Sequence, residues 1–139
     1  MGKIIIAGSK NRTVGGFMNV QINEKGSSKV AVIDSQEVLI DNTQDALDLM
    51  ATIRHMYDCD KMVISKSAIT ESFFDLKTGI AGEILQKYTN YNMKIAVVGN
   101  YEIYTSKSLK DFIYESNKGN QVFFLADEKE AIDRLHDAR

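Results

Sequence analysis

Four hydroxyl side chains follow one another closely after an apolar segment that ends at Ile64, namely Ser65, Ser67, Thr70 and Ser72. A helix is predicted to begin among them. Backbone N–H groups at the start of a helix have no partner within the helix, and the helix dipole is positive there. Hydroxyls at this position can help to bind an anion, or a serine among them can be phosphorylated. A simpler interpretation is that Thr70 and Ser72 only cap the helix.

A second polar group surrounds two glycines, Gly79 and Gly82, in the early turns of the same helix. Their spacing does not match a nucleotide-binding fingerprint, because no Gly-x-Gly-x-x-Gly precedes them. Close packing of the helix on the sheet, or a local bend, explains them more simply. The polar residues Lys77, Thr78 and Glu83 lie beside them and predict a surface that binds a small ligand or a protein partner.

A third polar surface is predicted on a helix that begins after Ser106. Lys107, Asp111 and Glu115 recur every four residues and therefore share one face of this helix. We expect the face to be solvated, and it is a further candidate for contact with a partner.

The sequence offers no set of residues suited to catalysis or to holding a metal. His55 and His136 are far apart, and neither has cysteine or acidic residues at the spacing of metal ligands. Cys59 lies between Asp58 and Asp60, whose charges raise the pKa of the thiol. Because no nucleophile, base and orienting group can be named, an enzyme is disfavoured. We assign no catalytic, cofactor-binding or metal-binding residue and expect no cofactor.

Composition narrows the class of partner. The net charge is −2 and no basic run is present, which predicts no binding to nucleic acid or to an anionic membrane. The one cysteine excludes an internal disulfide and is typical of the reducing cytoplasm. No apolar run approaches the roughly 18 residues needed to cross a bilayer. The expected location is therefore the cytoplasm.

The elements that must position these residues alternate along the chain. Alternating apolar residues on both sides of a turn at 26–28 predict a β-hairpin. Strands are predicted at 62–64, 94–99 and 122–125, and helices at 46–56, 70–88, 106–118 and 127–135, with a break near Gly79. Alternation of this kind implies parallel strands joined by right-handed crossovers. We predict a single α/β domain with a mostly parallel or mixed sheet, an N-terminal hairpin and about four helices.

Residues 1–17 are expected to stand outside this domain. Residues 3–8 resemble a short strand, and the polar run at 9–16 is either a flexible tail or a poor phosphate loop that lacks Gly-Lys-Ser/Thr. Residues 14–18 can also be encoded by a ribosome-binding site followed by a start codon. That hypothesis makes Met18 the true start and residues 1–17 a wrongly annotated upstream extension, with the domain at 18–139.

With these elements in place, residues 18–135 resemble a bacterial domain family of unknown function. Three runs carry the resemblance, at 45–49, 73–87 and 106–119. The family implies no activity that can be transferred to this chain.

Over the same span the chain is similar to STAS domains, the fold of bacterial anti-sigma-factor antagonists. Residues 69–73, Ile-Thr-Glu-Ser-Phe, stand where these domains have an acidic residue and a serine, and residues 124–131 resemble their last strand and helix. The resemblance implies a STAS-like fold and a serine that a kinase phosphorylates to break a partner contact. By position Ser72 is the candidate, with Thr70 second. The two phenylalanines after Ser72 depart from the small residues usual in that family.

We therefore expect a non-catalytic, cytoplasmic regulatory module that switches partners through residues 65–82. The partner is an unidentified protein or a second copy of the chain. The alternative is a sensor of a small anionic ligand or nucleotide bound at the turn formed by residues 65–72. A small enzyme of unknown reaction is the third and disfavoured class.

Overall fold

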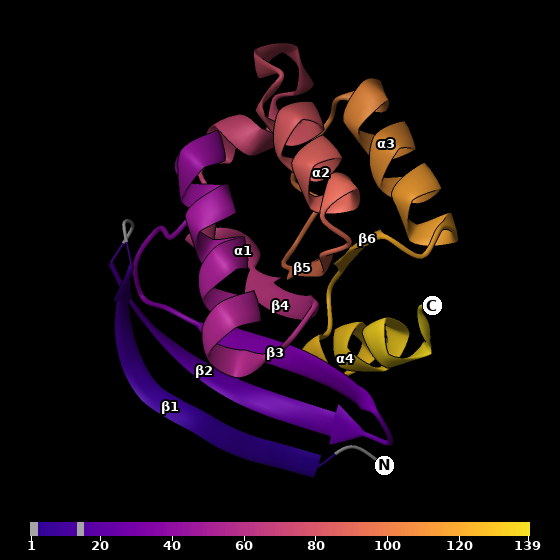
Figure 1. Ribbon diagram of the computed structural model, residues 1–139. Helices are drawn as coiled ribbons and strands as arrows, with labels where there is room; N and C mark the ends of the chain where they lie inside the picture. The colour runs from indigo at the N-terminus through magenta and orange to yellow at the C-terminus, as the bar shows by residue number, and fades with distance from the viewer. Residues whose placement is uncertain (1–2, 14–15) are drawn as a thin grey trace.

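The computed structural model describes the backbone of residues 3–13 and 16–139 and the side chains from Met18 onward. Figure 1 shows the arrangement of the elements along the chain. The elements are β1 (Lys3–Thr13), β2 (Gly16–Lys25), β3 (Ser28–Asp34), α1 (Thr43–Tyr57), β4 (Lys61–Ser65), the 3₁₀ turns η1 (Lys66–Ala68), η2 (Glu71–Phe74) and η3 (Leu76–Thr78), α2 (Ile80–Asn90), β5 (Lys94–Val98), α3 (Lys107–Lys118), β6 (Val122–Leu125) and α4 (Glu128–Asp137).

The strands of the described ranges form one six-stranded sheet in the order β1-β2-β3-β4-β5-β6. The pairs β1–β2 and β2–β3 are antiparallel, whereas β3, β4, β5 and β6 are parallel to one another. A tight turn at Gly26, which has a positive φ of 61°, joins the predicted hairpin. The predicted α/β fold, with a mixed sheet, an N-terminal hairpin and four helices, is confirmed.

The backbone of Lys3–Thr13 forms a strand that pairs with β2. Residues 1–17 were predicted to be a tail or a wrongly annotated extension before Met18. Some of these residues lie outside the described ranges, and this hypothesis stays a prediction.

Two helical layers cover the two faces of the sheet. Right-handed crossovers between successive parallel strands place α1, α2 and α3 on the same face. After β6 the chain passes to the opposite face as α4, as Figure 1 shows. Because side chains alternate along a strand, Met62 and Ile64 of β4 join the core under the three helices, whereas Val63 between them packs in the second core with Ala131 and Leu135 of α4.

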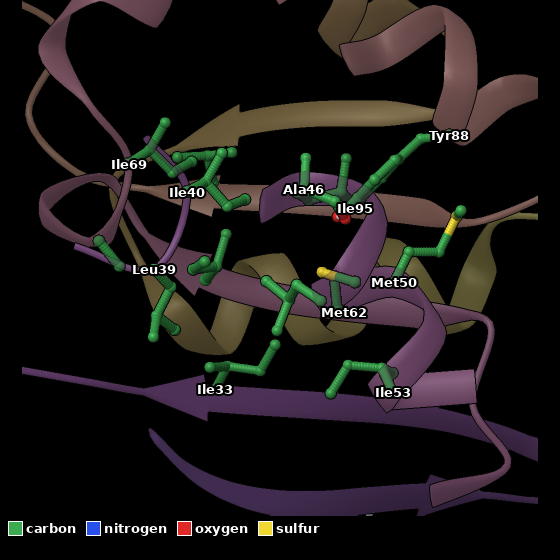
Figure 2. Close-up of a cluster of buried hydrophobic side chains, with 14 of the residues drawn as sticks. Ile33, Leu39, Ile40, Ala46, Met50, Ile53, Met62, Ile69, Tyr88 and Ile95 are labelled. Atoms are coloured by element: carbon green, nitrogen blue, oxygen red, sulfur yellow. The ribbon is translucent and has the colours of Figure 1, made fainter. Parts of the chain in front are cut away.

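Helix α1 illustrates how local signals and core packing agree. Its N-cap, Asn42, accepts a hydrogen bond from the Asp45 backbone N–H at 2.8 Å. Figure 2 shows the apolar side of the helix, including Met50 and Ile53, against the sheet residues Ile33 and Met62. In the same core the buried Tyr88 hydroxyl of α2 donates to the Ala46 carbonyl at 2.7 Å and so links the two helices.

Polar side chains from several elements join the amino ends of the parallel strands. Asn23 Oδ1 lies 2.7 Å from His136 Nε2, and Ser28 Oγ lies 2.8 Å from His136 Nδ1. Lys61 donates to the Ser28 hydroxyl at 3.0 Å and to the Ala138 carbonyl at 3.1 Å. Asn23 is buried, and this network pairs its side chain while tying α4 to the hairpin.

The edge strand β6 is protected by a side chain of α3. The Asn117 amide accepts from the Phe124 N–H at 2.7 Å and donates to the Phe124 carbonyl at 3.0 Å. One side chain thus occupies the backbone groups that an added strand would use. Arg134 of α4 donates to the Asn117 carbonyl and lies over the Phe123 ring, which ties both helices to this edge.

Candidate functional site

The hydroxyl-rich segment leaves the carboxyl end of β4 as a connector of short 3₁₀ turns, not as an α-helix. Helix α2 begins only at Ile80, after Gly79 takes a left-handed conformation with φ of 78°. The predicted break near Gly79 is therefore confirmed, but the prediction of an α-helix from Thr70 is wrong. The Thr78 hydroxyl donates to the Ser72 and Asp75 carbonyls, both at 2.9 Å, and accepts from the Ile80 N–H at 3.3 Å. Hydrogen bonds of this kind, from a side chain to nearby backbone groups, compete with the backbone hydrogen bonds of an α-helix.

The inner side of this connector, residues 65–79, is held firmly to the body of the protein. The Ala68 carbonyl accepts from the N–H groups of Leu39 and Ile40 at 2.7 and 3.0 Å, and the Thr70 N–H donates to the Ile40 carbonyl at 2.8 Å. Phe73 and Phe74 follow and are buried in the main core. The backbone path is therefore set by the segment after β3 and by apolar packing, with little freedom left to the connector.

A charged cluster joins the connector to the loop between β5 and α3. Lys66 Nζ lies 3.1 Å from Glu71 Oε1, and the Tyr104 hydroxyl donates to Glu71 Oε2 at 2.5 Å. The Lys66 ammonium also lies 4.9 Å from the ring centre of Phe74 and 5.0 Å from that of Tyr104. The Lys66 side chain is 14% exposed and that of Glu71 is 68% exposed. The cluster therefore joins one largely covered side chain to one that faces solvent.

The cluster shifts the pKa of both charged groups in favour of the ion pair. Burial lowers the pKa of Lys66, but the Tyr104 and Glu71 oxygens outweigh it, so the net pKa is raised. Burial likewise opposes the charge on Glu71, but the Tyr104 hydroxyl and the Lys66 ammonium lower its pKa overall. Both groups are thus charged near neutral pH, and the cluster acts as a fixed tether and not as a proton donor or acceptor.

Gly99, just after β5, makes room for the Lys66 side chain. A Cβ at position 99 would lie 2.5 Å from Lys66 Cβ and 2.9 Å from Lys66 Cδ. The absence of a side chain at Gly99 lets the two strand ends approach so closely that the lysine stem passes over the backbone.

The hydroxyls of the connector fall into two groups. Ser65 Oγ accepts from the Ser67 N–H at 3.3 Å and lies 2.9 Å from Ser67 Oγ, so these two serines close the first turn. Thr70 makes no capping bond and Ser72 lies within η2. The interpretation that Thr70 and Ser72 cap the following helix is therefore wrong, because that helix begins after Gly79. Ser72 is exposed, and its hydroxyl bonds to no described residue.

The glycine-centred surface continues the connector onto the first turn of α2. Lys77, Thr78, Gly79, Gly82 and Glu83 are all exposed. Gly79 has the positive φ that a bend requires, so the bend interpretation holds there. A Cβ at Gly82 would meet nothing within 4 Å, so close packing is not the reason for that glycine.

The third predicted surface lies apart on α3. Lys107 pairs with Asp111 at 2.7 Å, and Glu115 lies 3.6 Å from Lys118, all on that helix. These exposed pairs within one helix describe an ordinary solvated face.

Lys66, Glu71 and Gly99 were not predicted as site residues from the sequence. They come together because the carboxyl ends of parallel neighbours, here β4 and β5, meet at one edge of the sheet. The available signal was a lysine two residues after the predicted strand 62–64 and a glycine at the end of the predicted strand 94–99.

Two structural findings concern metal binding and the reactivity of Cys59. Within the described residues, no three His, Cys, Asp or Glu side chains gather in a way that could hold a metal ion. Cys59 is buried, and burial raises the pKa of its thiol to about 11. This thiol is therefore protonated and a weak nucleophile near neutral pH.

No helix in the described part of the chain has both the length and the apolar character needed to cross a membrane.

The structure defines the protein as an α/β domain in which a mixed sheet presents a structured polar connector at the carboxyl end of its parallel strands. The family model for a domain of unknown function, DUF4180, matches residues 25–135, and the chain belongs to this family. The predicted membership in an uncharacterised domain family is confirmed. Comparison with curated proteins and with solved structures gave no match.

Proposed function

We propose that the protein is a non-catalytic regulatory module that binds a protein partner through residues 65–82 and releases it when Ser72 is phosphorylated. The observation that carries this proposal is the contrast between the two sides of the connector. Its inner side is fixed by buried Phe73 and Phe74, whereas its outer side presents Ser72 with a hydroxyl that bonds to no described residue. A docking surface must keep its shape, and a modifiable serine must be accessible.

The surroundings of Ser72 give phosphorylation a physical effect. A phosphoserine carries a charge of about −1.5 to −2 at neutral pH. Glu71 precedes Ser72, and Asp75 follows in the same turn, so the new charge would meet like charges. Because Glu71 tethers the connector to Lys66 and Tyr104, repulsion there loosens the tether and changes the outer surface.

Two further arguments favour regulation over catalysis. The order of elements, with a hairpin followed by alternating strands and helices, is compatible with the proposed STAS-like architecture, whose members act by partner switching. Within residues 65–79, no serine or threonine hydroxyl hydrogen-bonds to a His, Asp or Glu side chain that could act as its base. We place the protein in the bacterial cytoplasm, where a buried free thiol such as that of Cys59 stays reduced.

The test places a photo-crosslinking amino acid at position 72 of the full chain in its native cells. A matched probe replaces Ser108, an exposed serine of α3 outside the connector. We expect one discrete product from position 72 and none of the same mass from position 108. Capture of the same product from both positions, or of none from position 72, would contradict the docking surface.

The switch is tested separately with Ser72→Glu and with Ser108→Glu as its control. We expect Ser72→Glu to abolish formation of the complex identified by crosslinking and Ser108→Glu to leave it unchanged. Equal binding by both variants would contradict regulation at Ser72 while leaving the docking surface intact. If the partner is a second copy of the chain, the same variants change the mass measured by light scattering.

A further inference from the structure

The two last parallel strands create a second place for a ligand, lined by residues outside the connector. The chain leaves β5 toward α3 on one face of the sheet and leaves β6 toward α4 on the other, as Figure 1 shows. Where neighbouring parallel strands send their connections to opposite faces, a crevice opens at the carboxyl ends, and open α/β sheets bind ligands there. In this sheet that point lies between Gly99 and Ala126.

A shallow crevice of about 950 Å³, largely open to solvent, occupies this point. Gly99, Leu125 and Ala126 from the two strand ends line it, and Ile113 of α3 forms part of its wall. This size is within the range of small-molecule sites, about 300–1,000 Å³.

The apolar part of the crevice combines two aromatic residues with the aliphatic side chains of Ile113, Leu125 and Ala126. Tyr101 and Phe124 both line it, and their ring centres are 5.7 Å apart in an edge-on arrangement. The Tyr101 hydroxyl is already bonded to the Val97 carbonyl at 2.6 Å, so the side chain offers its ring and not its polar group. Phe124 is buried, so the half-buried Tyr101 is the ring that can contact an aromatic guest.

Two opposite charges complete the lining. Lys110 and Glu102 both line the crevice, and neither forms an ion pair with any described residue. Other charges of α3 do pair, as Lys107 does with Asp111. The Asn100 side chain accepts from the Glu102 N–H at 3.0 Å and helps to hold that residue's backbone in place. The crevice thus offers one free ammonium and one free carboxylate beside an aromatic wall.

We propose that this crevice binds a free aromatic amino acid. The ligand's carboxylate pairs with Lys110, its ammonium pairs with Glu102, and its ring packs between Tyr101 and Ile113. The proposal does not rest on the proposed function, because the lining residues lie outside residues 65–82. The two regions do touch, since Gly99 lies against Lys66 and the Tyr101 ring lies 6.1 Å from that of Phe74. A ligand of this size in an open crevice is expected to bind with a dissociation constant of about 1 mM.

The test is titration of the full chain with L-phenylalanine, followed by amide NMR. We expect saturable shifts at Gly99 and Ala126. Two analogues of phenylalanine test the contribution of each charged group of the ligand to binding. 3-Phenylpropionate lacks the ammonium, and phenethylamine lacks the carboxylate. Each analogue should bind about tenfold more weakly, as expected for loss of one charged contact. Equal binding of 3-phenylpropionate, or the absence of saturable shifts with phenylalanine, would overturn the proposal.

Single substitutions test which charged residues of the crevice contact the ligand. Lys110→Gln and Glu102→Gln should each weaken phenylalanine binding about tenfold, whereas Lys118→Gln, at the far end of α3, should change it less than about twofold. Unchanged affinity in either of the first two variants would also overturn the proposal. Spectra that match the wild type away from the crevice confirm that each variant is folded.

Discussion

At the amino end of the parallel strands, Asn23, Ser28, Lys61 and His136 satisfy one another in a network that joins the hairpin to α4. At the carboxyl end, the connector is fixed by its backbone and by buried rings, while Ser72 faces solvent without a bond to any described residue. The first end uses polar groups to complete the fold. The second relies mainly on backbone hydrogen bonds and buried rings, with one solvent-facing tether from Glu71 to Lys66 and Tyr104, which leaves Ser72 available for a partner.

This difference predicts where substitutions affect stability and where they affect binding. Changes at the amino end, or beneath the connector, should destabilise the protein. Changes on the outer side of the connector should leave stability nearly unchanged and alter recognition.

The largest effect is expected beneath the connector, at Gly99. Gly99→Val places side-chain atoms where the Lys66 stem lies, at a Cβ separation of 2.5 Å. We expect a loss of about 2–3 kcal/mol in the free energy of unfolding, because overpacked sites force the backbone to shift. Urea denaturation measures it. Gly82→Ala is the control, since its Cβ meets open space, and it should stabilise by about 0.5 kcal/mol. If Gly99→Val leaves the free energy of unfolding unchanged, the connector is not held at this point.

At the amino end, His136→Ala should cost about 1–2 kcal/mol. The substitution leaves the buried Asn23 side chain without its partner, and an unpaired buried polar group carries a desolvation penalty of this order. The exposed His55→Ala should change stability by less than about 0.5 kcal/mol. Equal unfolding midpoints for the two variants in urea would show that the network at the amino end does not stabilise the fold.

The same network predicts a smaller, pH-dependent effect. Burial lowers the pKa of His136, and the charges of Lys61 and Lys25 add to this more than Asp133 and Asp137 oppose it. The unfolded chain, with a histidine pKa of about 6.5, therefore binds more protons as the pH falls through that value. The free energy of unfolding should fall as the pH drops below about 6.5.

Urea titrations at several pH values check this dependence. His136→Gln should flatten the curve near pH 6.5 while leaving the loss of stability at lower pH, where carboxylates become protonated. An unchanged slope in that variant would assign the dependence to another group.

The smallest effect is expected at the solvent-facing tether. Tyr104→Phe removes the hydrogen bond to Glu71, and because Glu71 is largely exposed, the cost should be about 0.5 kcal/mol. Tyr114→Phe, on an exposed tyrosine of α3, is the matched control. A loss as large as that of His136→Ala would show that the carboxyl end also depends on polar bonds for its stability.

Much of the fold could be predicted from local patterns. The hairpin turn at Gly26 and the apolar strands were predicted because alternation and turn residues act over a few positions. The starts of two predicted helices follow from the same kind of local signal, since Ser106 Oγ accepts from the Leu109 N–H and the Asp127 carboxylate accepts from the Glu130 N–H. Caps are local, so neighbouring residues are sufficient to predict them.

The connector shows where local patterns were insufficient. Residues 70–78 have an apolar spacing compatible with a helix, yet they form 3₁₀ turns, because Phe73 and Phe74 are drawn into the core and the backbone bonds to the segment after β3. Partners such as Ile40 and Thr70 are distant in the sequence, so no local window contains the interaction that decides the conformation.

The sequence was thus sufficient to indicate the class of fold, the order of its elements and the segment that carries the hydroxyls. Tertiary structure decided which hydroxyls are free, which lysine is tethered and which strand ends form a crevice. The physical reason is that each of these properties depends on contacts between segments far apart in the chain. Lys66 meets Gly99 and Tyr104, and Tyr101 meets Phe124, only after the parallel strands have paired.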